Sequence, residues 1–298
     1  MKNDNKRIGF IGAGMVGKSL AVALTNCGYN VVAVASRTYA SAENLAGLFD
    51  GCVAFRGPQA VVDACDFVLI TSTDDSIESV ASSVVWREGQ GVAHCSGVAS
   101  LEILSSSVGD GALVGAMHPL QAFSSVDYTE TALRGTTFAI EGNGEMRAYL
   151  KKIVLDLGGN PIFLRSEDKP LYHATVVMMG GILAGMFGHV ADLWAHFGIN
   201  RDDALNAITP IAQSVITSVN LAGIPQAIAG PYARGDIGTI KKHIDALRST
   251  APESMEVYCR MALAGLPYAL EKGKISERQA AEIKMVLSNV FESTDQKR

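Results

Sequence analysis

The first residues that could do chemistry are three glycines near the N-terminus. The segment IGFIGAGMVG places Gly12, Gly14 and Gly17 in the spacing G-x-G-x-x-G, directly after an apolar run and at the start of a helical pattern. This spacing suits a tight turn, the close approach of a pyrophosphate, and close packing of helix on strand. Free amides at the helix N-terminus would bind the phosphates. The pattern predicts a dinucleotide site, with a glycine turn that binds nothing as the alternative. The residues expected at this site are Gly12, Ala13, Gly14, Met15, Val16 and Gly17.

The next candidates follow the run VAVASRT, where Ser36, Arg37 and Thr38 stand. An NAD-binding domain usually places a carboxylate there to hold the ribose 2′-hydroxyl. A guanidinium and two hydroxyls suit a 2′-phosphate instead. The sequence therefore favours NADP over NAD, with a solvated arginine at a strand end as the alternative.

Polar residues also follow the next apolar runs, where the nicotinamide end of a dinucleotide is expected. These residues are Thr71, Ser72, Thr73, Cys95, Ser96 and Gly97.

Three further clusters could act on a substrate. His118 in MHPLQAF could exchange the proton that accompanies hydride transfer, or it could simply cap a loop. Lys169 and His173 are four residues apart and share a helical face, after a domain boundary. They could bind a carboxylate or polarise a carbonyl, although an exposed helix start explains Lys169 equally well.

The third cluster lies in GPYARGDIGTIKKHIDAL. Arg234 could clamp an anion, and Asp236 is expected to cap a helix on which Thr239 and His243 share its face. The alternative is a capped amphipathic helix with its polar residues outward. Together with Ser96, these four residues are the candidates for substrate binding.

The elements that must position these residues divide the chain in two. Strand and helix patterns alternate up to about residue 163, with strands RIGFIG, NVVAVAS, DFVLITS, GVAHCS, ALVGAM, TTFAIE and NPIFL. This alternation predicts an α/β Rossmann domain with a mostly parallel, doubly wound sheet over residues 1–166. Residues 167–298 predict an all-helical domain for substrate binding and dimerisation. Its expected helices are Lys169–Phe197, Arg201–Leu221, Asp236–Ser249, Pro252–Glu271 and Ser276–Phe291.

Composition argues against several classes of protein. A net charge of −5 over 298 residues does not favour nucleic acid or a membrane surface. The five cysteines lack metal-site spacing, so we expect no metal, reduced thiols and a cytoplasmic location. The segments between Lys169 and Asp192 and between Asp203 and Arg234 contain no acidic or basic residue. Histidines, glycines and prolines interrupt them, so we expect helices buried in a core or in a homodimer interface rather than membrane spans.

The whole chain resembles a family of Rossmann oxidoreductases with a C-terminal helical domain of unknown function, the DUF2520 type. The segments that carry the resemblance are GFIGAGMVGKSLAVAL, VVAVASRTYASAENLA, MHPLQAF, KPLYHATVV and GPYARGDIGTIKKHIDAL. The wider superfamily is similar too, and includes ketopantoate reductase, pyrroline-5-carboxylate reductase, prephenate dehydrogenase and the 3-hydroxyacid dehydrogenases. A C-terminal domain like that of 6-phosphogluconate dehydrogenase is implied as well.

The resemblance also implies roles for single residues. Lys169 looks like the helix lysine of ketopantoate reductases and hydroxyacid dehydrogenases, and His118 like the histidine of the prephenate dehydrogenase HP pair. The segment from Arg234 to His243 looks like the helix start that contacts substrate in ketopantoate reductase. The chain departs from these patterns at Tyr172, where an asparagine is usual, and at Gly180–Gly181, where the family carries Ser-Asn.

Three functions remain open. The first is NADPH-dependent reduction of a small 2-oxo acid that carries a carboxylate, with 2-dehydropantoate as the single best substrate. The second is an imine reductase of the pyrroline-5-carboxylate type. The third is a regulator that binds NADP without catalysis. The proton donor is expected to be Lys169, then His118, then His173.

Overall fold

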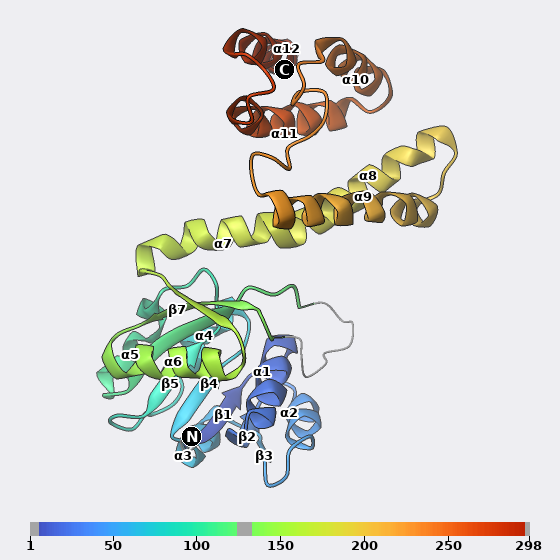
Figure 1. Cartoon of the computed structure of the whole chain (residues 1–298). Helices are drawn as coiled ribbons and strands as arrows, with labels where there is room; N and C mark the ends of the chain where they lie inside the picture. Colours follow the sequence, from blue (N-terminus) through green and yellow to red (C-terminus); the bar gives the residue numbers. More distant parts are fainter. Residues whose placement is uncertain (1–5, 124–132, 296–298) are drawn as a thin grey trace. The chain divides into compact units, whose positions relative to one another are not determined.

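A computed structural model describes residues 6–123 and 133–295 of the chain (Figure 1). The chain forms two compact units, Met1–Leu183 and Ala184–Arg298, and each is described by itself below. The first unit carries the sheet and the second is helical.

The first unit is built on one eight-stranded sheet with the order β3-β2-β1-β4-β5-β6-β7-β8. Every neighbouring pair is parallel except β6 and β7, which are antiparallel. All seven predicted strands are confirmed, and β3 is an additional short one. The strands are β1 (Arg7–Ile11), β2 (Asn30–Ala35), β3 (Val53–Phe55), β4 (Phe67–Ile70), β5 (Gly91–His94), β6 (Leu113–Pro119), β7 (Thr137–Gly142) and β8 (Asn160–Phe163).

Helices cover both faces of this sheet, as a doubly wound fold requires (Figure 1). One apolar core joins the sheet to α1 (Met15–Asn26), α2 (Tyr39–Ala46) and α6 (Gly144–Asp156). A second core joins its other face to α3 (Pro58–Ala64), α4 (Asp74–Ser82) and the 3₁₀ turn η1 (Leu101–Leu104). The short helix α5 (Ser105–Gly109) follows η1. The predicted α/β Rossmann architecture is confirmed.

A long helical run follows the sheet. It begins with the turn η2 (Ser166–Asp168) and α7 (Lys169–Val177), continues through the π-helical turn η3 (Met178–Ile182), and ends with α8 (Leu183–Leu193) and η4 (Trp194–Phe197). The boundary between the compact units falls inside this run, later than the predicted domain boundary at residue 166. Side chains from the first turns of α7 contact the sheet, so these turns belong to the first unit.

The second unit contains the four remaining helices, and all four were predicted. They are α9 (Arg201–Ala222), α10 (Ile237–Thr250), α11 (Pro252–Glu271) and α12 (Glu277–Asp295). An apolar core holds α10, α11 and α12 together. In contrast, α9 buries only Ala204 and α8 only Ala191. The helical C-terminal half of the prediction is confirmed, but two of its helices are poorly covered.

The long helical run is more apolar and less buried than the sequence predicts. By length and composition, Ser166–Phe197 is the one helix in the described part of the chain that could cross a membrane. The glycines and histidines within it do not lower its apolar character enough to exclude this. Only 6% of its most apolar window is buried, so it is not a core helix either. Its apolar side chains instead form an exposed surface.

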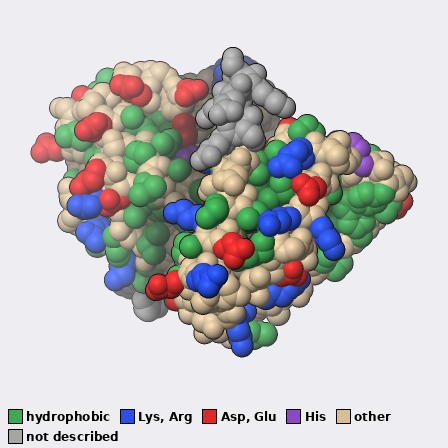
Figure 2. Space-filling model, turned by 90° about the horizontal axis from the view of Figure 1, so that it is seen from above, with side chains coloured by type: hydrophobic (Ala, Val, Ile, Leu, Met, Phe, Trp, Pro, Cys, Tyr) green, Lys and Arg blue, Asp and Glu red, His purple; other side chains and the backbone are tan. Residues whose placement is uncertain are grey.

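The charged surface is mixed. On the face drawn in Figure 2, acidic and basic side chains are interspersed with hydrophobic ones, and neither sign forms a large patch. None of the five cysteines, all of which the structure describes, forms a disulfide.

Candidate active site

A cavity of about 540 Å³ lies along the carboxyl ends of β1, β2 and β4. Nine of the predicted cofactor residues line it. They are Gly12, Ala13, Gly14, Ser36, Arg37, Thr38, Thr71, Ser72 and Thr73. The other five, Met15, Val16, Gly17, Cys95 and Ser96, are not among its lining residues.

The glycine turn is shaped to leave room at one position only. A Cβ on Gly17 would lie 2.4 Å from the Gly12 carbonyl oxygen, and a Cβ on Gly12 would lie 2.5 Å from the Thr71 backbone. Gly12 also has a φ of +118°, which favours glycine. At Gly14, in contrast, a Cβ would meet nothing within 4 Å. The turn is therefore packed beneath and open above Gly14, where a phosphate would approach.

The amides that would hold that phosphate are available. Gly14 is the N-cap of α1, and no side chain caps this helix end. The first amides of a helix lack partners within it, and they carry the positive end of the helix dipole. The turn itself is fixed, because the Thr71 hydroxyl donates to the Gly12 carbonyl at 2.7 Å.

Two guanidinium groups lie at the far end of the cavity, after β2 and β3. Arg37 was predicted, whereas Arg56 was not. The Arg56 guanidinium lies 4.2 Å from the centre of the Tyr39 ring. Within residues 6–123 and 133–295, neither arginine has a carboxylate partner. Two uncompensated cations beside one cavity fit a phosphate group.

A buried polar atom supports the fit of a ligand. The Ser72 hydroxyl oxygen is buried and has no hydrogen-bond partner in the described structure, although Ser72 lines the cavity. Buried hydroxyls are normally hydrogen-bonded. With the open glycine turn and the two arginines, the residues present fit a dinucleotide that carries an extra phosphate.

A second group of side chains meets where β5 and β6 end. Lys169, at the start of α7, lies with its Nζ 3.3 Å from Oε2 of Glu141 on β7. The side chains of Lys169 and Glu141 are only 3% and 7% exposed. The alternative that Lys169 is an exposed helix start is therefore wrong. Pro170 occupies the first turn of α7, as expected.

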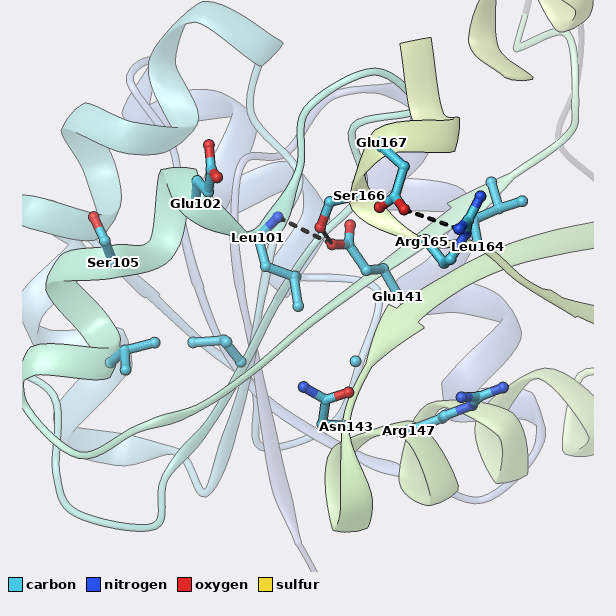
Figure 3. Close-up of a pocket in the computed structure, with 13 residues that line it drawn as sticks. Leu101, Glu102, Ser105, Glu141, Asn143, Arg147, Leu164, Arg165, Ser166 and Glu167 are labelled. Atoms are coloured by element: carbon cyan, nitrogen blue, oxygen red, sulfur yellow. Dashed lines mark hydrogen bonds and ion pairs between the residues drawn. The ribbon is translucent and has the colours of Figure 1, made fainter. Parts of the chain in front are cut away.

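The other Glu141 oxygen is held separately (Figure 3). Oε1 accepts a hydrogen bond from the Ser166 hydroxyl and one from the Leu101 amide at 3.4 Å. Glu141 and Ser166 also line a second cavity of about 610 Å³, beside η1 and the start of α6. The carboxylate is thus fixed from three directions.

Burial lowers the pKa of Lys169, and the neighbouring Glu141 carboxylate opposes this by raising it. Asp74 and Cys95 also raise the Lys169 pKa. Asp74 begins α4 directly after Thr73 of the cavity, and Cys95 follows β5. Lys169 therefore lies near the strand ends at which a nicotinamide is expected.

The antiparallel β6–β7 pair explains why Glu141 reaches this place. Ala116 pairs with His94 on one side and with Glu141 on the other. Side chains that pair directly across strands point to the same face of a sheet. His118 lies two residues beyond Ala116 in β6 and so shares this face. His94, Glu141 and His118 are thus placed together by strand register alone.

The two predicted histidines pack on Gly97. The rings of His118 and His173 are 5.7 Å apart. A Cβ on Gly97 would lie 2.5 Å from Cδ2 of His173 and 2.9 Å from Nε2 of His118. Only glycine leaves space there for both rings. His118 lies inside β6, so the alternative that it caps a loop is wrong.

His118 has a defined partner. Its Nδ1 lies 2.8 Å from the hydroxyl of Tyr172 on α7. Burial, then the charges of His173 and Lys169, lower the pKa of His118 to about 4. Burial raises the pKa of Tyr172. At neutral pH the pair is therefore an uncharged imidazole beside an uncharged phenol. Tyr172, noted in the sequence as a departure from the family pattern, thus belongs to the cluster.

The loop after β5 is positioned by a residue that the sequence did not single out. The Ser96 amide donates to Nδ1 of the buried His94 at 3.2 Å. The Ser96 hydroxyl accepts bonds from the amides of Val98 and Ala99. Burial is the main cause that lowers the pKa of His94 to about 3, so this histidine is neutral. Ser96 itself is buried, and its hydroxyl shapes the loop that carries Gly97.

The third predicted cluster lies in the second unit. Asp236 caps α10 and accepts from the amide and hydroxyl of Thr239 at 3.0 and 2.8 Å. Arg234 is exposed and pairs with Asp236 at 3.2 Å. His243 is exposed, with Nδ1 3.0 Å from the Tyr258 hydroxyl. The predicted cap is confirmed, while the role of these residues in substrate binding stays a prediction.

Two family models match the chain. A Rossmann-like domain covers residues 1–119, which is the class that the sheet and the glycine turn define. The second is the domain of unknown function DUF2520, over residues 136–264. The chain thus combines these two domains, as the resemblance predicted. A search of curated proteins finds no match.

Solved structures share the fold. A Bacteroides fragilis protein assigned as an NADP oxidoreductase is 23% identical, with a TM-score of 0.72, and the match covers 88% of this chain and 98% of that one. A pyrroline-5-carboxylate reductase of Streptococcus pyogenes is 16% identical (TM-score 0.60; 90% and 98% covered). A reductive aminase of Aspergillus terreus, solved with NADPH, is 16% identical (TM-score 0.60; 97% and 95% covered).

Proposed function

We propose that this protein is an NADPH-dependent reductase of a small carbonyl or imine compound. The observation that carries the proposal is the position of one group of side chains, which we call the Lys169 cluster. Its members are Lys169, Glu141, His118, Tyr172 and His173. It lies in the same compact unit as the dinucleotide cavity, where the neighbouring strands of one sheet end. Ligands of doubly wound folds bind outside these strand ends.

The cavity supports NADPH in particular. Arg37 and Arg56 provide cations for a 2′-phosphate, and no carboxylate follows β2 to repel it. The solved structures with this fold include an enzyme in complex with NADPH. When bound, NADPH supplies the hydride. The chain's own residues must then bind and orient the substrate and manage one proton.

Lys169 is the first candidate for that proton. Its Nζ is the only lysine nitrogen recorded in a buried ion pair within the described residues. Its pairing with Glu141 argues against a second role, the binding of a substrate carboxylate, because its charge is already compensated. His118 is the second candidate and would act through the Tyr172 hydroxyl, while His173 is the third.

The first substrate class that we propose is a small 2-oxo acid, with 2-dehydropantoate as the first compound to assay. Reduction of a ketone forms an alkoxide that needs a proton, and the Lys169 ammonium can donate one. The prediction that Arg234 binds the substrate carboxylate is tested separately below, because Arg234 belongs to the second unit and already pairs with Asp236.

A second class, cyclic imines, is favoured by the charge of the cluster. Lys169 is compensated by Glu141, and His118 is uncharged at neutral pH. Such a site does not repel a cationic iminium. Two of the solved structures named above are a pyrroline-5-carboxylate reductase and a reductive aminase, which share this fold. We also propose that the protein acts in the cytoplasm on a small molecule.

A screen of 2-oxo acids and cyclic imines with NADPH, followed by loss of NADPH absorbance, tests the proposal. With a substrate in hand, Lys169→Ala or His118→Ala should slow turnover by roughly 10²–10⁴-fold if that residue is the acid. Lys151→Ala, at an exposed lysine of α6, is the control. NADPH binding with no turnover of either substrate class would instead favour the regulator.

Arg234→Ala is measured separately. If Arg234 binds the substrate carboxylate, this variant should raise KM and leave NADPH affinity unchanged. Parent-like kinetics of Lys169→Ala, His118→Ala and Arg234→Ala would exclude catalysis by Lys169 or His118 and carboxylate binding by Arg234.

A further inference from the structure

No motif or spacing in the sequence singles out Glu141. It lies near the end of β7, 7% exposed, and it is the carboxylate that approaches Lys169 most closely in the described residues. Its Oε1 is occupied by Ser166 and the Leu101 amide, so Oε2 remains for the lysine. Figure 3 shows Ser166 and Leu101 beside Glu141.

We propose that Glu141 is a positioning residue that keeps Lys169 charged and fixed at the sheet edge, ready to donate a proton. The proposal rests on the function proposed above and adds a residue to that site. Glu141 acts through Lys169, because its carboxylate faces the lysine and the second cavity.

The need for such a residue follows from burial. A lysine removed from water loses its proton readily, since the charged form is no longer solvated. A neutral amine could not serve as the acid in a reduction. A fixed carboxylate within about 4 Å opposes this effect by stabilising the ammonium.

Other charged and titratable groups act on the same nitrogen. Asp74 of α4 and Cys95 after β5 favour the charged form. Burial is the main cause that lowers the pKa of His94 and of His118, and the charge of Lys169 lowers both further. Among the groups that favour the ammonium, Glu141 has the largest effect on the Lys169 pKa, and its Oε2 lies 3.3 Å from Nζ.

The hydrogen bond from Ser166 fixes the orientation of the Glu141 carboxylate. Ser166 stands three residues before Lys169 and belongs to the turn η2 that leads into α7. One segment thus supplies both the lysine and the hydroxyl that orients its partner. Loss of the Ser166 hydroxyl should loosen Oε1, while the Leu101 amide still holds it.

The test measures Lys169 directly and requires no substrate. The full chain is labelled with ¹³C-lysine, and the Lys169 side-chain signal is assigned by its loss in Lys169→Arg. The pH titration of this signal is then compared between the parent and Glu141→Gln. The Lys169 pKa should fall by roughly one unit or more, as expected for loss of a near opposite charge.

Matched variants decide the cause. Glu102→Gln removes a carboxylate that lines the same cavity without contacting Lys169, and it should leave the titration unchanged. Ser166→Ala should give a smaller fall than Glu141→Gln, and it remains informative if Glu141→Gln does not fold. NADPH affinity reports whether each variant keeps its fold.

Two results would overturn the proposal. One is a Lys169 titration that is the same in folded Glu141→Gln or in Ser166→Ala as in the parent. The other is a fall as large in Glu102→Gln. Because the titration is measured without turnover, failure to find a substrate would count against the proposed reductase and would leave this result intact.

Discussion

Arg56 offers the sharpest test of the cofactor site, because it is a residue that the sequence pattern did not identify. We predict that Arg56→Gln lowers the affinity for NADPH and leaves the affinity for NADH nearly unchanged. Arg56 and Arg37 line the same cavity without a carboxylate partner, so either charge is free to meet a phosphate. NADH lacks the 2′-phosphate, so its affinity should not depend on the Arg56 charge.

The magnitude follows from the exposure of the site. Two unit charges 4 Å apart are worth about 1 kcal/mol in bulk water, so a doubly charged phosphate is worth about 2 kcal/mol to each arginine. This corresponds to roughly 30-fold in Kd. Charge reversal in Arg37→Asp adds repulsion of the phosphate, so it should raise the Kd for NADPH at least about tenfold.

Fluorescence titration of both cofactors measures these effects. Arg147→Gln is the matched control, since Arg147 lies 4.0 Å from the Phe163 ring centre and outside the NADPH cavity. The double variant Arg37→Gln, Arg56→Gln reports whether the two charges share one phosphate. Equal losses for NADH and NADPH in Arg56→Gln, or equal affinities in the parent protein, would refute the reasoning.

Three more predictions follow from the structure. Gly14→Ala should keep the thermal stability of the parent but lower the affinity for NADPH, whereas Gly17→Ala should lower the Tm, because its Cβ would lie 2.4 Å from a carbonyl oxygen. Calorimetry measures the Tm and titration measures the NADPH affinity. Equal Tm values for the two variants would contradict this prediction. Stability should fall as the pH drops below 6.5, because His118, with a folded pKa of about 4, stays neutral while the unfolded chain takes up the proton. His118→Asn should flatten that slope by up to about 1.4 kcal/mol per pH unit between roughly 4 and 6.5, and an unchanged slope in denaturant melts would oppose it. Light scattering should show a homodimer. Val215→Glu, on the exposed face of α9, should dissociate the dimer, whereas the control Met285→Glu, at an exposed residue of α12, should not. A monomeric parent protein at micromolar concentration would exclude the dimer.

The sheet and the cofactor turn could be predicted because their signals are local. An apolar run before G-x-G-x-x-G fixes a strand, a turn and a helix within about a dozen residues. The position of Arg37 follows from the end of the next strand. Arg56 was missed because β3, which places it, has only three residues and shows no alternation.

The Lys169 cluster was predicted only in part, because it depends on contacts between distant segments. Lys169 and His173 share a helical face, so their common direction is visible in the sequence. The pairing of Ala116 with Glu141 depends on the register of two antiparallel strands, and no local pattern fixes it. Tyr172 lies between the two predicted residues, yet its hydroxyl reaches His118 only in the folded unit.

The long apolar segments show a different limit. An uncharged stretch predicts burial but does not say what covers it. In this chain α9 buries only Ala204, and we propose that a second copy of the chain covers its exposed apolar face. A single sequence does not show whether such a partner exists.

The burial of the Glu141–Lys169 pair has a consequence for ionic strength. Dissolved salt screens exposed charges over about 10 Å at 0.1 M, but it acts much less on charges enclosed by protein. Arg37 and Arg56 are exposed, whereas the ion pair is 3% and 7% exposed. Raising the salt concentration should therefore weaken cofactor capture while the charge state of Lys169 persists. A simple salt series can thus separate the binding of NADPH from the proton chemistry at the sheet edge.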